Sequence, residues 1–279
     1  MGRPFLKMNG AGNDFVVVDA LSHSHPAPFA PDEAGVRAIA DRESGIGCDQ
    51  LIGIEPSRGA DAFMRIWNAD GGQVEACGNA TRCVGWLLME ASGRDEARIE
   101  TVAGLVTARR AGPLSVTVDM GAPRLGWQDI PLSEEMDTRG IELQVGPIDD
   151  PHLHTPGCVN MGNPHVVFFV PNAEAAPVVQ VGSMIEHHYL FPEGVNVGFA
   201  EVRARGEIRL RVWERGAGLT KACGTGACAA LVAACRRGMI GREAEVIMDG
   251  GTLHIEWRES DDHVLMTGPV AVEFTGTLP

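Results

Sequence analysis

The chain has no excess of basic residues, no apolar run of membrane-spanning length and no Cys-x-x-C pair. It carries 23 Lys and Arg against 37 Asp and Glu, which gives a formal net charge of −14. Such a charge repels polyanions, so we expect no nucleic-acid partner. The opening MGRPFLKMNGAGNDF also lacks the basic-then-apolar pattern of a signal peptide. We therefore expect no membrane association and a cytoplasmic location.

The seven cysteines do not show the spacing of a disulfide framework or of a metal site. An odd number of cysteines without an export signal is not typical of a disulfide-rich secreted protein. The close pairs Cys77/Cys83 and Cys223/Cys228 are spaced too widely for a zinc knuckle. We expect no metal ion.

The sequence does contain a long internal repeat. IWNADGGQVEACGNATRCVGWLL, from Ile66, is answered by VWERGAGLTKACGTGACAALVAA, from Val212. The tryptophans of the two copies are 146 residues apart (213 − 67), and the cysteines after Ala76 and Ala222 repeat that interval. Three further landmarks recur in the same order, at intervals of 146 or 150 residues. A series of this kind indicates that a whole domain was duplicated.

Between the landmarks, the patterns mostly predict strands. Short β-branched or alternating runs bounded by Gly, Asn or Pro lie at residues 15–19, 63–67, 115–119, 166–170, 208–213 and 253–257. A helix is predicted after each Ala-Cys-Gly. The first should end near Ala91, before Ser92-Gly93, and the second near Arg237, with Gly238 as its C-cap. The second helix is apolar nearly all round, so it must be enclosed on every side.

These patterns predict an α/β (α+β) fold of two pseudo-symmetric, duplicated domains. Each domain should be a mixed, mostly antiparallel β-sheet wrapped around a central apolar helix. We expect one domain at 1–122 plus 269–279, carrying the first cysteine of the repeat, and the other at 123–268, carrying the second. Residues 129–150 read as a polar connection with few strands.

Cys77 and Cys223 each precede a glycine that opens a helix. The positive end of a helix dipole and its unpaired N–H groups favour a thiolate, so we expect thiol pKa values below the usual ~8.5. The glycines, Gly78 and Gly224, let a carboxylate approach those N–H groups closely. Two such thiols on opposite sides of an α-carbon could remove a proton from one face and return one to the other. This is the chemistry of a two-base racemase or epimerase, and no lysine lies in a recognisable cofactor motif, so we expect no cofactor.

A lone cysteine in an apolar segment is more often a small core residue. We apply that interpretation to Cys83, Cys228 and Cys235, which fall inside the two helices, and we take Cys48 and Cys158 as structural. For the two repeated cysteines the repeat favours catalysis. The alternative of another class is a non-catalytic thiol protein, either a zinc binder or a redox sensor.

Eight motifs give the chain a resemblance to a known family. They are Gly12-Asn-Asp-Phe, Cys48-Asp-Gln-Leu, Trp67-Asn-Ala-Asp-Gly, Ala76-Cys-Gly-Asn, Met161-Gly-Asn-Pro-His, Val195-Asn-Val-Gly-Phe, Glu214-Arg-Gly-Ala-Gly and Ala222-Cys-Gly-Thr-Gly-Ala. In these motifs, over essentially its full length, the chain resembles the diaminopimelate epimerases. That family converts LL-2,6-diaminoheptanedioate to the meso form, on the route to lysine and peptidoglycan. The resemblance also implies a homodimer.

The resemblance assigns roles to individual residues. It implies that Cys223 takes the proton of the LL-substrate and that Cys77 returns one. His165 and Glu214 resemble residues that tune the pKa values of the thiols. The residues implied in substrate binding are Asn13, Gln50, Asn68, Gly78, Asn79, Asn163, Asn196, Glu214, Arg215, Gly224 and Thr225. A proline or hydroxyproline racemase of the same fold is the alternative enzyme, although its substrate has no distal carboxylate for Arg215 to bind.

Overall fold

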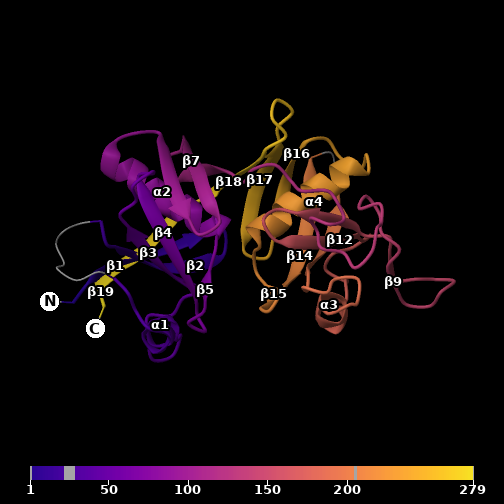
Figure 1. Cartoon of the computed structure of the whole chain (residues 1–279), viewed down its shortest axis with the longest axis horizontal. Coiled ribbons are helices and arrows are strands. Elements are labelled where there is room, and N and C mark those ends of the chain that lie inside the picture. The colour runs from indigo at the N-terminus through magenta and orange to yellow at the C-terminus, as the bar shows by residue number, and fades with distance from the viewer. Residues whose placement is uncertain (1, 22–28, 204–205, 279) are drawn as a thin grey trace. The chain divides into compact units, whose positions relative to one another are not determined.

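The computed structural model describes residues 2–21, 29–203 and 206–278. The chain divides into two compact units. Unit 1 comprises Met1–Asp119 and Thr267–Pro279, and unit 2 comprises Met120–Met266. The colour gradient of Figure 1 shows that the chain leaves unit 1 after β8, forms unit 2 and returns to unit 1 within β18.

The elements of unit 1 are two helices and a set of strands from both ends of the chain. They are β1 (Pro4–Gly10), β2 (Asn13–Asp19), α1 (Glu33–Ala40), β3 (Gln50–Glu55), β4 (Ala62–Asn68), β5 (Gln73–Val74), α2 (Gly78–Ser92), β6 (Glu96–Thr101), β7 (Gly104–Gly112), β8 (Ser115–Asp119) and β19 (Ala271–Thr277).

Unit 2 repeats this pattern with a longer first connection. Its elements are β9 (Gln144–Val145), β10 (Leu153–His154), β11 (Gly157–Asn160), β12 (Pro164–Phe169), α3 (Val178–Glu186), β13 (Asn196–Val202), β14 (Glu207–Glu214), β15 (Gly218–Thr220), α4 (Gly224–Arg236), β16 (Glu243–Met248), β17 (Gly251–Trp257) and β18 (Val264–Pro269). Strand β18 begins in unit 2 and ends in unit 1.

The elements predicted from sequence patterns are present. The six predicted strands correspond to β2, β4, β8, β12, β14 and β17. Helix α2 ends at its C-cap Gly93, which is left-handed with φ of 69°. The C-cap of α4 is Arg237 and not the predicted Gly238, which follows it at φ 68°, a conformation that glycine adopts without steric cost. The stretch 129–150 contains the two-residue strand β9 and no other strand, as predicted. The prediction that it is a polar connection is wrong, because Ile130, Leu132, Ile141 and Leu143 are buried in the core of unit 2.

The duplication is visible in the strand pairings. In unit 1, β2 pairs with β3 in parallel and β3 pairs with β4 antiparallel, and in unit 2 the strands β12, β13 and β14 repeat that arrangement. Leu51 is paired with Trp67 in unit 1, and Val197 is paired with Trp213 in unit 2. Both members of the second pair lie 146 residues after those of the first. The pairing of the strands therefore repeats at the same interval as the sequence. The predicted fold class is confirmed.

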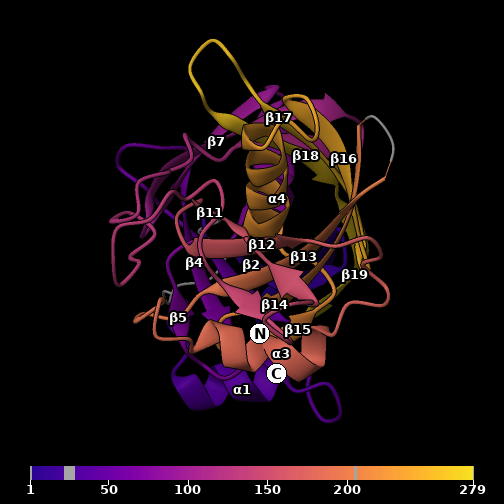
Figure 2. The same cartoon turned by 90° about the vertical axis from the view of Figure 1, so that its right-hand side faces the viewer.

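Each unit is built around one of the cysteine-capped helices. Helix α4 packs against β11, β12, β13, β14, β16 and β17, and its residues from Gly226 to Ala234 are all buried. Figure 2 shows α4 with β11, β12, β16 and β17 around it. Helix α2 packs against β1, β2, β6, β7 and β8, and it lies beside β7 in Figure 1. Helix α4 of unit 2 is therefore enclosed by strands, as expected of a helix that is apolar nearly all round.

The shorter helices α1 and α3 occupy equivalent places in the two repeats. Helix α3 packs against β13, β14 and β15. Its Gly182 allows this approach, because a Cβ there would lie 2.5 Å from ring atoms of Trp213. Helix α3 therefore abuts the end of β14, which carries several of the predicted site residues.

One cysteine prediction needs correction. Cys48, Cys83, Cys158 and Cys228 are buried, in agreement with the core interpretation, whereas Cys235 is half-buried. It belongs to the last turn of α4, and residues 237–239, which follow this turn, are exposed.

Within residues 2–21, 29–203 and 206–278, no helix is long and apolar enough to cross a membrane. Across the same ranges, no group of three or more His, Cys, Asp or Glu side chains is arranged to hold a metal ion.

Candidate active site

Cys77 and Cys223 occupy the same position in their units, the N-cap of the central helix. Their backbones are extended and nearly identical, with φ/ψ of −150°/111° for Cys77 and −137°/106° for Cys223. Each cysteine carbonyl accepts the first helical N–H at 2.9 Å, from Thr81 in α2 and from Ala227 in α4. Both thiols therefore lie beside the first, unpaired N–H groups of a helix.

The side chains of these two cysteines have different surroundings. Cys77 is half-buried, and its Sγ accepts a hydrogen bond from the backbone N of Ala80 at 3.5 Å. Cys223 is only 4% exposed, and its Sγ lies 3.6 Å from the Thr225 hydroxyl. The backbone N of Cys223 also donates to the Met248 sulfur at 3.4 Å. The N-cap geometry is thus repeated, while the exposure of the thiol is not.

The expectation of a lowered pKa is wrong for Cys223. Burial raises the pKa of this thiol well above its ordinary value, and the negative charge of Glu214 raises it further. Hydrogen bonds from Thr225 and from the backbone of Gly226 act in the opposite direction but are outweighed. Desolvation by the surrounding strands therefore exceeds the effect of the helix N-terminus.

Glu214, the last residue of β14, is the acidic neighbour of Cys223. Its carboxylate forms a hydrogen bond with the Cys223 thiol. The Thr220 hydroxyl, on β15, donates to Glu214 Oε1 at 2.5 Å. The pairing of β14 with β15 thus places a carboxylate against the thiol of α4.

His165 lies on β12 and is buried, with 1% exposure. Burial, with a smaller contribution from the positive charge of Arg215, lowers its pKa to about 3. Its Nε2 is 2.9 Å from Oδ1 of Asn163. Because a carbonyl oxygen only accepts, Nε2 carries the proton in this pairing. The imidazole is neutral near pH 7 and is held in one orientation.

Arg215 and Asn196 meet at the end of β14. Asn196 donates from Nδ2 to the Pro164 carbonyl at 2.8 Å, and its Oδ1 accepts the backbone N of Arg215 at 3.0 Å. Nη1 of Arg215 donates to the Glu193 carbonyl at 3.0 Å. The buried amide of Asn196 is therefore engaged with the backbone, and the exposed guanidinium of Arg215 remains open to solvent.

The predicted amides of unit 1 form two hydrogen-bonded pairs. Asn79 Nδ2 donates to Asn13 Oδ1, and Gln50 Nε2 donates to Asn68 Oδ1 at 3.0 Å. Asn13 Nδ2 in turn donates to Asp49 at 3.2 Å. The structure therefore brings together Asn13 with Asn79 and Gln50 with Asn68, as neighbours within unit 1.

Two acceptor oxygens in this group are available to a hydrogen-bond donor. Within the described part of the chain, Gln50 Oε1 and Asn79 Oδ1 are buried oxygens without a hydrogen-bond partner. A buried polar atom left unsatisfied costs about 1–3 kcal/mol, so native structures rarely retain one without a reason. Oxygen acceptors of this kind suit an ammonium group, which only donates.

The structure adds residues that the sequence patterns did not single out. Asp49 orients Asn13, and its place beside Gln50 in the Cys48-Asp-Gln-Leu motif was an available signal. Glu186, at the end of α3, is buried and accepts hydrogen bonds from both sides of the Glu214–Arg215 segment. No local pattern distinguishes it, because its partners lie 27 and 30 residues away.

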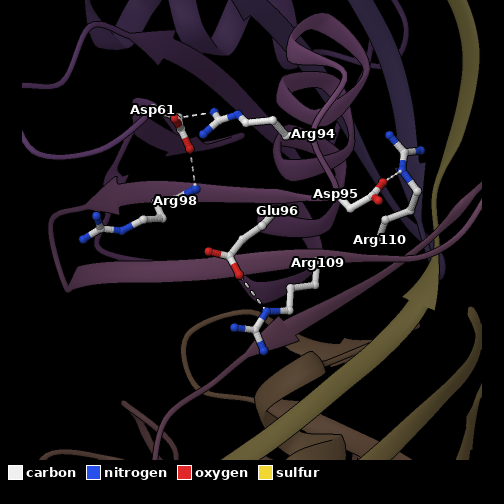
Figure 3. Close-up of a pocket in the computed structure, with 7 residues that line it drawn as sticks. All are labelled: Asp61, Arg94, Asp95, Glu96, Arg98, Arg109 and Arg110. Carbon is white, nitrogen blue, oxygen red and sulfur yellow. Dashed lines mark hydrogen bonds and ion pairs between the residues drawn. The ribbon is translucent and has the colours of Figure 1, made fainter.

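A charged surface groove of about 550 Å³ lies elsewhere on unit 1. Figure 3 shows the seven residues that line it: Asp61, Arg94, Asp95, Glu96, Arg98, Arg109 and Arg110. Its carboxylates are engaged by neighbouring arginines, at 2.5 Å for Asp61 and Arg94 and at 2.8 Å for Glu96 and Arg109. It contains none of the predicted site residues, and we assign it no function.

The fold is shared with a solved epimerase. A hydroxyproline epimerase from Agrobacterium vitis, solved with bound trans-4-OH-L-proline, superposes with a TM-score of 0.67 at 17% identity, over 99% of this chain and 92% of that one. At this identity the likeness shows a shared fold, within which each half of this chain has a cysteine at the N-cap of its central helix.

Sequence comparison identifies the family. The profile described as diaminopimelate epimerase matches residues 5–126 and 157–273. A diaminopimelate epimerase from Phenylobacterium zucineum is 65% identical over 279 residues, covering 100% of this chain and 99% of that protein. One from a Caulobacter species is 60% identical over 292 residues, covering 100% and 98%. The chain belongs to the diaminopimelate epimerase family.

Proposed function

We propose that the protein converts LL-2,6-diaminoheptanedioate to the meso form by proton transfer at one α-carbon between two cysteine side chains. The observation that carries the proposal is the repeated N-cap: Cys77 and Cys223 have the same backbone conformation at the start of equivalent helices. Membership of the diaminopimelate epimerase family supports the choice of substrate.

In this proposal each half of the duplication contributes one thiol and one helix N-terminus. The N–H groups at Gly78 and Asn79, and at Gly224 and Thr225, bind the carboxylate of the reacting centre. Removal of the α-proton develops an enediolate, and fixed N–H donors stabilise the charge that appears on its oxygens. Neither half can invert the centre alone, because a single thiol reaches only one face of the carbon.

The proton of the LL-substrate is taken by Cys223, and Cys77 returns a proton to the opposite face. Without substrate, Cys223 is a neutral thiol, since burial and Glu214 raise its pKa. We infer that the Glu214 carboxylate accepts the thiol proton when substrate binds. The thiolate left behind then removes the α-proton. This role is consistent with the hydrogen bond between Glu214 and the thiol.

The remaining polar residues bind the two amino-acid ends. We assign substrate ammonium groups to the unsatisfied oxygens of Gln50 and Asn79. The guanidinium of Arg215 provides a bidentate cation for the distal carboxylate. Neutral His165 orients Asn163, which we assign to substrate binding. The family resemblance supports a role of His165 itself in tuning the pKa values of the thiols. Asn13, Asn68, Asn196 and Glu214 complete the set of substrate-binding residues.

Assembly and location follow from the family resemblance. The protein should act as a homodimer in the cytoplasm on a small-molecule substrate. Analytical ultracentrifugation of the purified chain measures the first point directly, and a single sedimenting species of monomer mass would contradict it.

The reaction is tested with LL-diaminopimelate in heavy water. The reduced protein should yield meso product with deuterium at one α-carbon, as seen by mass spectrometry and NMR. Cys77→Ala and Cys223→Ala should each lose epimerisation. Trans-4-hydroxy-L-proline serves as the competing substrate, and its turnover in place of diaminopimelate would favour the alternative racemase activity. Absence of deuterium uptake by folded, reduced wild-type protein would refute the proposal.

A further inference from the structure

We propose that Glu186 is a positioning residue that holds the Glu214–Arg215 segment in its active geometry. The inference rests on the proposed function, in which Glu214 accepts the proton of the Cys223 thiol and Arg215 binds the distal carboxylate of the substrate. Glu186 is the last residue of α3, and its side chain is only 8% exposed. Nothing in its local sequence indicates a role in the site.

Both carboxylate oxygens of Glu186 are engaged, one on each side of that segment. Oε2 accepts the indole N–H of Trp213 at 2.7 Å, and Oε1 accepts the backbone N–H of Gly216 at 2.8 Å. Glu214 and Arg215 lie between these two donors in the chain. Hydrogen bonds to an ionised acceptor are shorter and stronger than neutral ones. A single side chain therefore clamps both ends of a four-residue segment.

Other contacts leave this segment little freedom. Asn196 Oδ1 accepts the backbone N of Arg215, so the N–H groups of two successive residues have buried side-chain acceptors. The Arg215 stem passes Gly194 so closely that a Cβ there would lie 3.0 Å from Cδ of Arg215. With the backbone fixed in this way, Glu214 lies against Cys223 and the guanidinium of Arg215 is presented to solvent.

The free-energy cost of burying a carboxylate indicates that Glu186 has a specific role. A buried carboxylate is expensive unless its charge is satisfied, and an apolar side chain would fill the same space more cheaply. The exposed imidazole of His187 lies alongside, but its Nε2 is 3.9 Å from Oε1, beyond a hydrogen bond. The charge of Glu186 is thus stabilised mainly by the two N–H donors whose positions it fixes.

The other repeat lacks this arrangement. The position 146 residues before Glu186 is Ala40, the last residue of α1. In unit 1 the equivalent turn follows Asn68, and it is held from α1 by Arg37, whose Nη1 donates to the Asp70 carbonyl at 2.7 Å. Among the described residues, the turn that carries Glu214 and Arg215 is therefore held from the preceding helix by a carboxylate, whereas the equivalent turn of unit 1 is held by a guanidinium.

The test compares Glu186→Gln with Glu135→Gln, which removes an exposed carboxylate of the same unit. An amide keeps only one acceptor oxygen, so one of the two N–H groups loses its partner. We expect the KM for diaminopimelate to rise about ten-fold in Glu186→Gln, with a smaller change in kcat. Glu135→Gln should have wild-type constants. A wild-type KM in folded Glu186→Gln would overturn the inference.

A double-mutant cycle separates positioning from general destabilisation. If Glu186 acts through Arg215, Glu186→Gln should change KM by less than about two-fold in an Arg215→Ala background. Equal effects in both backgrounds would show that Glu186 does not act through Arg215, which would overturn the inference. Should Glu186→Gln not fold, Glu186→Asp keeps the charge but is one methylene shorter, so it cannot reach both donors. The same rise in KM is then expected, and a wild-type KM in folded Glu186→Asp would equally overturn the inference.

Wild-type deuterium uptake is measured alongside these variants. If wild-type protein takes up no deuterium, the proposed function fails. If wild-type protein is active and the Glu186 variants have its KM, only the inference fails.

Discussion

At the scale of single residues, Cys77 and Cys223 have the same backbone conformation but different chemical surroundings. The two N-caps agree in conformation, but Cys223 is buried beside a carboxylate and Cys77 is half-buried and hydrogen-bonded to its own helix. In Cys223 the environment, more than the helix terminus, therefore sets the protonation state.

The influence of Glu214 on Cys223 can be measured by alkylation. After burial, the negative charge of Glu214 is the next largest cause of the raised pKa of Cys223, so Glu214→Gln should lower that pKa. At a fixed pH below the pKa, more of the thiol is then ionised and iodoacetamide should react faster. Peptide mass spectrometry between pH 6 and 9 gives the rate, with half-buried Cys235 as the internal reference. A slower reaction at Cys223 would contradict this assignment.

His165 should make stability depend on pH. Its folded pKa of about 3 lies below the ordinary value of 6.5, because burial disfavours the charged ring. Below pH 6.5 the unfolded chain therefore binds a proton that the folded protein does not. The free energy of unfolding should fall with decreasing pH by about 1.4 kcal/mol per pH unit from this residue, between 6.5 and about 3. The full stabilisation is present only above pH 6.5.

Urea denaturation of wild-type and His165→Gln protein at several pH values isolates this contribution. For each protein, the free energy of unfolding is plotted against pH, and the two slopes are subtracted. The subtraction cancels the titration of other groups, including His188, whose pKa is also lowered by burial. Identical slopes would show that the imidazole is not desolvated.

At the scale of elements, helix α2 lies against β7 at a contact that only glycine permits. A Cβ on Gly85 would lie 2.5 Å from the Cβ of Ala108. Alanine favours a helix interior over glycine by roughly 1 kcal/mol, but forcing these elements apart costs more. Gly85→Ala should therefore destabilise the protein by about 1–3 kcal/mol in urea denaturation.

Gly241→Ala is the matched control for that prediction. Gly241 has no atom within 4 Å of an added Cβ, and its φ is not in the left-handed region. The substitution should be neutral or stabilise by a few tenths to 1 kcal/mol. A stabilising effect of Gly85→Ala would mean that α2 can move away from β7 without loss.

The elements also show what the sequence could predict and where it could not. The starts of α2 and α4, the stop at Gly93 and the repeat interval were predictable, because caps and register depend on neighbouring residues. The raised pKa of Cys223 was not, since it depends on burial by strands distant in sequence. Glu186 was missed for the same reason, and the engagement of Asn196 with the backbone could not be read from its motif.

At the scale of the whole molecule, unit 1 depends on residues from both ends of the chain. Strand β19 pairs with β1 along Pro4–Asn9, and Phe274 meets Phe5 edge to face at 6.0 Å between ring centroids. Leu278 belongs to the same core cluster as Phe5. The core cluster built on β12 and β13 draws only on unit 2 residues.

Removal of residues 270–279 should therefore affect the two units unequally. Without β19, strand β1 keeps only its pairing with β2 and the core around Phe5 loses Leu278. Hydrogen exchange should become faster at backbone amides of β1 and β2, while β12 and β13 keep their protection. Mass spectrometry of peptic fragments makes the comparison, and equal loss of protection in all four strands would contradict it.

The insertion of unit 2 between the two parts of unit 1 fixes an order of events during protein synthesis. Domains generally fold as their residues emerge from the ribosome, at about 5–20 residues per second. Residues 120–266 are all made before β19, so unit 2 can be completed while β1 still lacks its neighbour. At those rates, on the order of ten to fifty seconds pass between the synthesis of β1 and that of β19. During this time one edge of β1 is unpaired and can bind a chaperone or another nascent chain. The unit that begins first is the last to be finished.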